Sequence, residues 1–306
     1  MEINKLMEGF NDKSIFFNDD WINKLYDPED IISIQKEYKG SYLKAIFQKK
    51  KYFGLTILTA PDLCPYNVQI VHTDKSQSDY ISFKKDAELL QHFKSEITKY
   101  SIVKWKYHWT NYSVSPIVDH KVQCRWAQTS IISRDTSISE LYQNLYFKTR
   151  NSLQNNDIKF SIRRIDFSMF YELAKQDEYY NKAKINFDRF QEFFSIDSHS
   201  NYFFPFGIFD EDNRLQSCVV LIRDGSTMYL WMNIAEIDQR SRNANRKLIW
   251  HSINFAFDQK CDFNFDGSNQ FFLDKVFRTY NPKIIPYPTF VYTKNYFGRV
   301  IQSLKK

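Results

Sequence analysis

The sequence predicts an α/β protein built from two consecutive lobes, each with a mixed sheet flanked by helices. In the second half, a predicted hairpin over 216–234 is followed by a helix over 243–257 and by a short strand over 263–266. The first half repeats the order of strands, helix and strand. In α/β folds, ligands bind where strand ends meet helix N-termini, so we expect the ligand at such a place in the second half.

Length and composition agree with two folded domains. The chain has 306 residues, of which 43% are apolar and 18% aromatic, which is enough to form large cores and excludes global disorder. We therefore expect an N-terminal lobe over residues 1–135. A C-terminal lobe that includes a bridging helix is expected over residues 136–306.

Local patterns place five elements in the first lobe. They are a helix over 20–26, strands over 42–48 and 52–58 with a turn between them, a helix over 86–100 and a strand over 102–109.

A long bridging helix is predicted from Ser137 to about Asn155. Ser137 followed by Glu140 is a capping-box pattern, and Leu141 and Leu145 fall on one face at helical spacing. The elements that follow are a strand over 159–165, a helix over 167–176 that Asp166 caps, a helix over 187–194, a strand over 202–209 and a turn over 210–213.

The helix over 243–257 is predicted to begin with Asn243 as its N-cap and to be buried on two sides. Arg240 and Arg242 come just before it. Backbone N–H groups at a helix start, together with two guanidinium groups, are typical of an anion site, and we assign these three residues to donor binding. The alternative is that both arginines only solvate a loop.

Two residues are candidate catalytic groups. Asp266 lies at the end of the strand over 263–266, where a ligand can approach, and is the candidate general base; its alternative role is to brace the turn. His251 on the central helix is the second candidate, with core packing as its alternative.

The candidate substrate contacts come from several elements. Tyr229 and Trp231 share one face of a strand and are placed to stack on a base or sugar, although core packing is the simpler role. Lys148 and Arg150 point different ways on a helix, so one of them is expected to reach a phosphate or carboxylate. The remaining candidates are Asn245 and Ser268, which also caps the helix after the last strand.

The charge pattern favours anionic small ligands. The net charge is +6, the longest basic run is 49–51, with a short one at the end over 305–306, and the other charges are interspersed. A mildly basic chain suits CoA, tRNA or nucleotide sugars, whereas DNA-binding proteins concentrate their charge on one face, so DNA is not expected as a partner. The N-terminus has no apolar signal region and no run reaches transmembrane length, so we expect a cytoplasmic protein with no membrane span.

The cysteines do not suggest a metal or redox site. Cys64, Cys124, Cys218 and Cys261 are far apart and form no C-x-x-C motif, so they are expected to be reduced, and no zinc spacing exists. The chain also lacks the G-x-S-x-G, P-loop and Rossmann glycine motifs.

Four segments in a fixed order carry a resemblance to a known family. They are 148–153 (KTRNSL), 206–209 with the strand over 215–222, 245–250 (NRKLIW) and 263–268 (FNFDGS), followed by Phe277-Arg278 and Pro286-Tyr287. Together, over roughly 129–294, they resemble the FemAB-like branch of the GNAT acyltransferase superfamily.

The resemblance implies two tandem GNAT-like lobes, the first of them degenerate, and transfer of an acyl or aminoacyl group to an amine. It implies no permanently bound cofactor; the co-substrate is an acyl-CoA-type donor and the acceptor is a small molecule, a sugar or a nucleotide-linked envelope precursor. One departure concerns 239–244 (QRSRNA), where GNAT proteins that bind acetyl-CoA have glycines and this chain has none.

Three alternatives remain open. An aminoacyl-tRNA donor would need a coiled-coil arm of heptads, and none is visible in the sequence, which favours a CoA-type donor. A non-catalytic binding module is favoured by the missing glycines. A nucleic-acid-binding protein is favoured only by mild basicity and the many aromatic residues.

Overall fold

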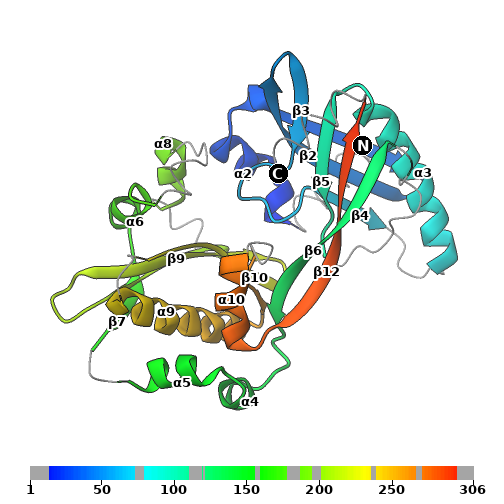
Figure 1. Cartoon of the computed structure of the whole chain (residues 1–306). Helices are drawn as coiled ribbons and strands as arrows, with labels where there is room; N and C mark the ends of the chain where they lie inside the picture. Colours follow the sequence, from blue (N-terminus) through cyan, green and yellow to red (C-terminus); the bar gives the residue numbers. More distant parts are fainter. Residues whose placement is uncertain are drawn as a thin grey trace. The chain divides into compact units, whose positions relative to one another are not determined.

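The computed structural model describes residues 14–72, 79–109, 119, 121–155, 159–177, 187–194, 201–235, 239–266 and 271–294. These residues form a mixed α/β fold in two compact units (Figure 1). Unit 1 contains described residues within 16–128 and 286–294, and unit 2 contains those within 129–285 together with 14–15. The predicted fold class, an α/β protein with mixed sheets flanked by helices, is confirmed.

The chain passes between the units within two strands, β6 (Val122–Ile132) and β12 (Lys283–Thr293). The sequence predicted a single division at 135/136. Within the described residues the compact units divide the chain at 15/16, 128/129 and 285/286, and residues 289–293 of β12 pair with β5 in unit 1.

The sheet of unit 1 has the strand order β1-β2-β3-β5-β12, and β4 pairs with part of β2. Its other strands are β1 (Ile31–Tyr38), β2 (Ser41–Tyr52), β3 (Leu55–Thr59), β4 (Val68–His72) and β5 (Ile102–Lys106). Helix α3 (Asp79–Ile97) contributes Leu89, Leu90 and Phe93 to the core of this unit. The short elements η1 (Ile15–Phe17), α2 (Asp19–Leu25) and η2 (Pro28–Asp30) precede the sheet.

The position of one turn in unit 1 was predicted wrongly. The sequence placed a turn between strands ending at 48 and starting at 52, but β2 continues to Tyr52 and the turn is Phe53-Gly54. Residues 49–51 are therefore strand residues that pair with 56–58. Both turn residues have positive φ, the conformation that two-residue hairpin turns require.

The sheet of unit 2 has the strand order β6-β11-β10-β9-β8-β7. Its strands besides β6 are β7 (Ser161–Arg164), β8 (Phe203–Phe209), β9 (Leu215–Asp224), β10 (Thr227–Ala235) and β11 (Asp262–Asn264). Only the β10–β11 pair is parallel among these neighbours. The predicted hairpin over 216–234 is thus confirmed as β9 and β10.

Helices cover both faces of the unit 2 sheet (Figure 1). Helix α9 (Gln239–Asp258) packs on one face, and α6 (Phe167–Ala174) and α8 (Phe187–Phe190) lie on the other. The remaining elements are α4 (Ile138–Gln143), α5 (Phe147–Gln154), η3 (Gln191–Phe193), α10 (Phe271–Phe277) and η5 (Arg278–Tyr280). No helix among the described residues has the length and apolar character needed to cross a bilayer.

The bridging segment is two helices rather than the one long helix predicted. Ser137 caps α4 as predicted, because its Oγ accepts a hydrogen bond from the Glu140 N–H at 3.1 Å. The helix stops at Asn144, and α5 starts after Tyr146, whose backbone is extended and whose N–H donates to the Thr279 carbonyl. A tertiary contact with η5 therefore interrupts a continuous helical pattern.

Helix α9 is the centre of the unit 2 core. Leu248, Ile249, Ile253 and Ala256 are fully buried against the sheet. Each large apolar side chain buried in this way stabilises the fold by roughly 1.5–3 kcal/mol. This packing fixes the direction of α9, so its first turn and the end of β10 are held at the same end of unit 2.

Candidate functional site

Strands β10 and β11 are paired over a short length and then separate. Their parallel pairing covers only Thr227 to Tyr229 on β10, and β11 ends at Asn264, the partner of Tyr229. Strand β10 continues to Ala235, paired with β9, and its register shifts at a bulge between Leu230 and Met232. Within the described part of the chain, β11 does not accompany β10 beyond Tyr229. We call residues 230–235 the β10 edge.

The structure corrects the predicted start of α9. Asn243 was expected to be its N-cap, but the helix begins at Gln239, so Asn243 lies in its second turn. Helical geometry directs the Asn243 N–H to the carbonyl of residue 239, four positions earlier. The helix N–H groups that face outward are those of 239–242. Arg242 is exposed in this first turn, and the side chain of Arg240 lies outside the described residues.

Asn243 has a role in helix packing instead. Its Oδ1 accepts hydrogen bonds from Ser152 Oγ at 3.2 Å and from an Arg246 guanidinium nitrogen at 3.0 Å. Arg246 also bonds Ser152, and the Tyr280 hydroxyl donates to the Arg246 carbonyl at 3.1 Å. This polar cluster ties α5 and η5 to α9, which explains an asparagine inside a helix.

Buried polar side chains hold the first turns of α9 against β9. Ser241 is fully buried and donates to Gln216 Oε1 at 3.1 Å, and Gln216 donates to Asp210 Oδ2 at 2.8 Å. Ser217 Oγ lies within hydrogen-bond distance of both the Ile234 carbonyl, at 2.9 Å, and Asn245 Oδ1, at 3.0 Å. Asn245, predicted to contact substrate, is thereby engaged with the end of β9.

Asp266 lies two residues beyond the last β10–β11 pair. Its backbone is left-handed, with φ at 44°, a conformation that Asp tolerates better than most residues. Its N–H donates to Asn264 Oδ1 at 2.9 Å, and the same oxygen accepts from Thr129 Oγ1 at 2.7 Å. Asn264 therefore braces this turn, and the half-buried Asp266 follows the point where β11 leaves β10.

The strand before Asp266 is shorter than predicted. The sequence predicted regular alternation over 263–266, but β11 ends at Asn264. Phe263, Asn264 and Phe265 are all buried, and the two phenylalanine rings contact each other at 5.0 Å. The turn that Asn264 makes brings Phe265 back to the core instead of continuing the strand.

His251 does not lie near the first turn of α9. It is 9–12 residues further along the helix, which is roughly 14–18 Å at 1.5 Å per residue. It is half-buried against the Phe206 ring at 5.3 Å, and this burial lowers the pKa of the imidazole. The surroundings match a neutral packing residue.

Tyr229 and Trp231 are core residues of β10. They are only 1% and 5% exposed, and Trp231 packs against the Phe190 ring of α8 at 5.6 Å. Phe190 itself contacts further rings of α6, η3 and β8. Both rings thus have the core-packing role that the sequence offered as the simpler one.

The two basic residues of α5 point apart, as the sequence predicted. Lys148 is exposed, with its amine 6.0 Å from the Phe147 ring. Arg150 donates from its guanidinium group to the Gln143 carbonyl at 3.0 Å, which satisfies the end of α4. The last predicted contact, Ser268, lies outside the described residues, and these contain no group of three or more His, Cys, Asp or Glu able to hold a metal.

Comparison with known proteins gives a match in structure only. No family model matches the sequence, and no curated protein matches it either. The fold is similar to the crystal structure of FemX, with a TM-score of 0.61 and 10% identity over 92% of this chain and 91% of that one.

Two further structures are similar over most of their length. The C-terminal domain of a putative lysylphosphatidylglycerol synthetase from Agrobacterium fabrum has a TM-score of 0.53 and 9% identity over 90% of this chain and 87% of that one. L-PGS from Bacillus licheniformis has a TM-score of 0.51 and 10% identity over 90% and 88%. At such low identity these similarities establish the fold, which is FemX-like, as the four sequence segments implied.

Proposed function

We propose that this protein transfers an acyl or aminoacyl group from an activated donor to an amine, at the β10 edge of unit 2. The separation of β10 from β11 after Tyr229 carries this proposal, because beside the bulge β10 is paired with β9 on one side and, among the described residues, has no paired strand on the other. A backbone N–H there is suited to hydrogen-bond a donor carbonyl and to stabilise the oxyanion that forms when the amine attacks. The donor carbonyl is therefore assigned to the β10 edge, and the anionic part of the donor is assigned to a second place in unit 2.

The anionic part of the donor is assigned to the first turn of α9. The N–H groups of 239–242 attract phosphate, and Arg242 adds an exposed guanidinium group. We propose Arg240 as a further anion-binding residue, because it lies in the same turn of the sequence. Hydrogen bonds of Ser241 and Asn245 fix the first two turns of α9 to β9, which supports this assignment because it holds the proposed anion site at a constant position relative to β10.

The reaction requires one proton acceptor. A neutral amine attacks the donor carbonyl, a new C–N bond forms, and the bond from the carbonyl carbon to the leaving sulfur or oxygen breaks. The amine proton goes to Asp266 and passes from there to the departing sulfur or oxygen, which restores the carboxylate. Asp266 is placed for this role by its position just beyond the end of β11.

The nature of the donor separates two versions of this proposal. A CoA thioester is the first candidate, because no sequence pattern for a tRNA-gripping arm is present. An aminoacyl donor is the second, because one of the similar structures is named as a putative lysylphosphatidylglycerol synthetase.

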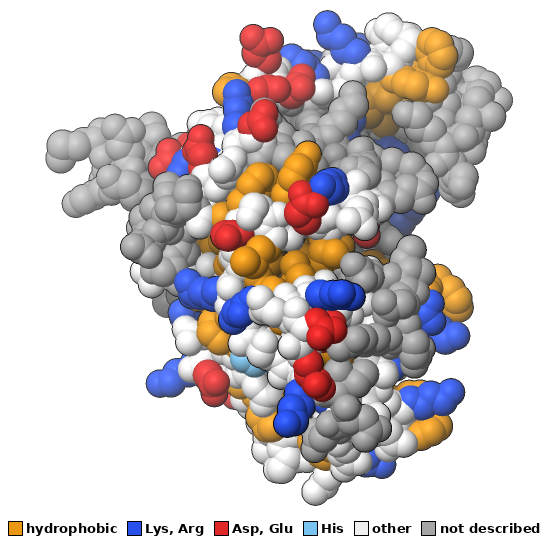
Figure 2. Space-filling model, turned by 90° about the vertical axis from the view of Figure 1, so that its left-hand side faces the viewer, with side chains coloured by type: hydrophobic (Ala, Val, Ile, Leu, Met, Phe, Trp, Pro, Cys, Tyr) orange, Lys and Arg blue, Asp and Glu red, His pale blue; other side chains and the backbone are white. Residues whose placement is uncertain are grey.

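The surface charge gives little support to a nucleic-acid-binding protein. On the face shown in Figure 2, basic and acidic side chains are interspersed rather than segregated by sign. A nucleic-acid site is expected to gather its positive charge along one path.

A donor panel tests the proposal. CoA thioesters and aminoacyl-tRNAs are screened by thermal shift, and each ligand that stabilises the protein is assayed for transfer to amines. Arg242→Ala is expected to weaken donor binding by about 5–150-fold, equivalent to roughly 1–3 kcal/mol for a charge-assisted contact. The matched control is Arg125→Ala, an exposed arginine of β6, which should bind normally. Binding without transfer would identify a binding module instead of an enzyme.

A further inference from the structure

The turn between β2 and β3 exposes two aromatic rings at the outer end of a hairpin (Figure 1). Phe53 is 79% exposed and Tyr52 is 40% exposed, and their rings meet edge to face at 4.5 Å. Tyr52 pairs with Leu55, so Phe53 and Gly54 alone form the loop. Water disfavours this arrangement, since no part of the fold covers most of the Phe53 ring.

Phe53 is also a poor residue for the backbone of this turn. Its φ is 46° and that of Gly54 is 73°, the geometry of a two-residue turn that prefers Asn or Asp followed by Gly. A bulky side chain at positive φ is strained. The turn between β1 and β2 has the same geometry, with φ of 46° and 74°, and carries Lys39-Gly40. The fold therefore accepts a polar residue at this position, and Phe53 serves neither the turn nor the core.

Three lysines lie directly behind the exposed rings. Lys49 and Lys51 share one face of β2, because side chains alternate along a strand, and Lys50 points to the other face. Lys50 forms an ion pair with Asp62 at 3.2 Å. Among the described residues no ion pair involves Lys49 or Lys51. The tip of the hairpin thus combines apolar rings with an excess of positive charge.

Acidic residues of η2 lie beside the inner end of this lysine run. Glu29 and Asp30 come just before β1, whose first residue, Ile31, pairs with Gln48 on β2. Lys51, next to Tyr52, is the lysine nearest the aromatic tip, and it forms no ion pair among the described residues.

We propose that the β2–β3 turn docks unit 1 on an anionic lipid bilayer. Aromatic side chains favour the interface between headgroups and acyl chains and enter it by about 5–10 Å. Lys51 and Lys49 lie two and four residues behind Phe53, which is roughly 7 and 13 Å along a strand. When the rings enter the interface, Lys51 lies at the level of the anionic headgroups, whose layer is about 5–8 Å deep, and Lys49 lies just outside this layer.

The edge-to-face contact joins the two rings into one compact apolar tip, which is suited to enter a lipid interface. Single-stranded nucleic acid is the alternative partner, because the exposed Phe53 ring can also stack on a base, and the experiment below separates the two.

Vesicle co-sedimentation with the full chain tests the proposal independently of any enzymatic activity. Vesicles of phosphatidylcholine alone are compared with vesicles that contain phosphatidylglycerol, at low and high salt. We expect binding to the anionic vesicles only, weakened by salt. Phe53→Asn should reduce the partition coefficient at least about tenfold, from the apolar area lost. Lys51→Gln should reduce it about fivefold.

The Asn substitution separates a docking role from a structural one. Because Asn suits positive φ, Phe53→Asn should keep or raise the melting temperature while binding is lost. Lys39→Asn makes the same change in the matched β1–β2 turn and should leave vesicle binding unchanged. Equal vesicle binding by wild type and Phe53→Asn, or no binding by wild type, would overturn the proposal. Binding of a labelled single-stranded oligonucleotide through Phe53, without vesicle binding, would replace lipid with nucleic acid.

Discussion

The two units share an order of elements but differ where their parallel strands part. In unit 2, β10 and β11 separate after Tyr229 and Asn264. In unit 1, the corresponding β3 and β5 pair in parallel only at Ile57–Leu58 and Ile102–Val103. Beyond these pairs, the place between β2 and β5 is occupied in unit 1 by Asn67, the residue just before β4.

Asn67 joins β2 to β5 through four hydrogen bonds. Its N–H donates to the Lys106 carbonyl and its Oδ1 accepts from the Lys106 N–H, at 3.1 and 2.8 Å. Its carbonyl accepts from the Ile46 N–H and its Nδ2 donates to the Ile46 carbonyl, at 3.0 and 2.9 Å. In unit 1, the buried Asn67 thus occupies the place next to the separating parallel strands. In unit 2, the corresponding place lies beside the β10 bulge. This difference supports placing the proposed donor site in unit 2.

The largest expected effect is a loss of turnover on substitution of Asp266 in unit 2. Asp266→Asn nearly preserves the shape of the side chain but removes the proton acceptor, so kcat should fall roughly 10²–10⁴-fold. Melting temperature should stay close to that of wild type. Asp258→Asn, at an exposed position near the end of α9, is the control and should leave kcat unchanged. A lower melting temperature with normal turnover per folded molecule would assign Asp266 to structure.

Substitution of Asn67 in unit 1 should lower the stability of the protein and leave its turnover unchanged. Asn67→Ala leaves the Ile46 carbonyl and the Lys106 N–H without their side-chain partner in a buried place. We expect the free energy of unfolding to drop by roughly 2–4 kcal/mol, since each unmet buried group costs about 1–3 kcal/mol. Urea unfolding measures this loss, and Asn151→Ala on the exposed side of α5 should change stability little. A selective loss of donor binding in folded Asn67→Ala protein would show that unit 1 holds a site.

These differences show what the sequence could reveal. Local signals predicted the β9–β10 hairpin and the caps Ser137 and Asp166, whose partners are three residues away. The contacts of Asn67 reach 21 and 39 residues along the chain, and Thr129 bonds Asn264 across 135 residues. No periodicity or capping pattern encodes such pairings, so neither the closure of unit 1 nor the brace before Asp266 could be predicted.

The predicted start of α9 was wrong for a related reason. The run over 239–242 is polar and was interpreted as a loop before an Asn243 cap. Ser241 is nevertheless fully buried, with Gln216 of β9 as its partner, and this tertiary bond makes a polar segment the first turn of a core helix. Of the candidate residues, Arg242 and Asp266 remain proposals for the site, whereas Asn243, Asn245, Tyr229 and Trp231 have packing partners that the sequence could not supply.

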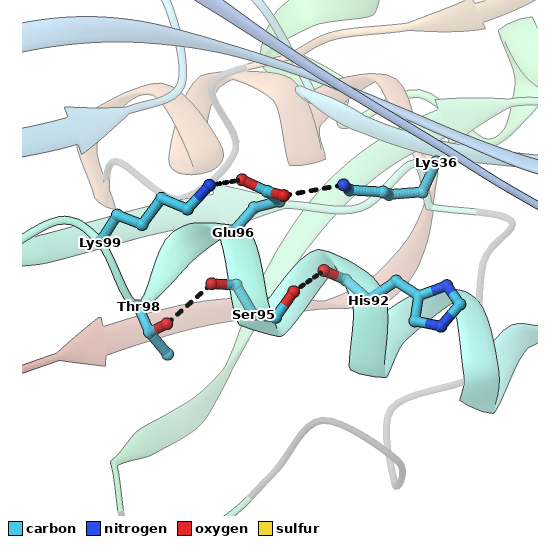
Figure 3. A network of polar contacts seen from close by, with 6 residues as sticks. All are labelled: Lys36, His92, Ser95, Glu96, Thr98 and Lys99. Carbon is cyan, nitrogen blue, oxygen red and sulfur yellow. Dashed lines mark hydrogen bonds and ion pairs between the residues drawn. The ribbon is translucent and has the colours of Figure 1, made fainter.

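The smallest expected effect concerns pH and the surface of unit 1. Glu96 of α3 forms ion pairs with Lys36 and Lys99 (Figure 3), and these hydrogen bonds lower the pKa of its carboxyl from 4.5 to about 2. A lowered pKa stabilises the folded state above the ordinary pKa, and this contribution is lost as pH falls from 4.5 towards 2.

Thermal unfolding of wild type and Glu96→Gln across this range measures the contribution. Wild type should be slightly more stable than the variant at pH 6, and the difference should disappear near pH 2. Because the cluster is exposed, added salt should shrink the difference as well. A difference that grows towards low pH would contradict the ion pairs.

Amide hydrogen exchange tests the central claim, that donor binds beside β10 in unit 2 and not at the equivalent place in unit 1. Exchange is followed in both units with and without the donor that gives the largest thermal shift, chosen from acetyl-CoA, longer-chain CoA thioesters and aminoacyl-tRNA. The account predicts slower exchange over 230–235 and 239–242, with no change over 59–67. Protection over 59–67, or donor binding that leaves both 230–235 and 239–242 unchanged, would contradict it.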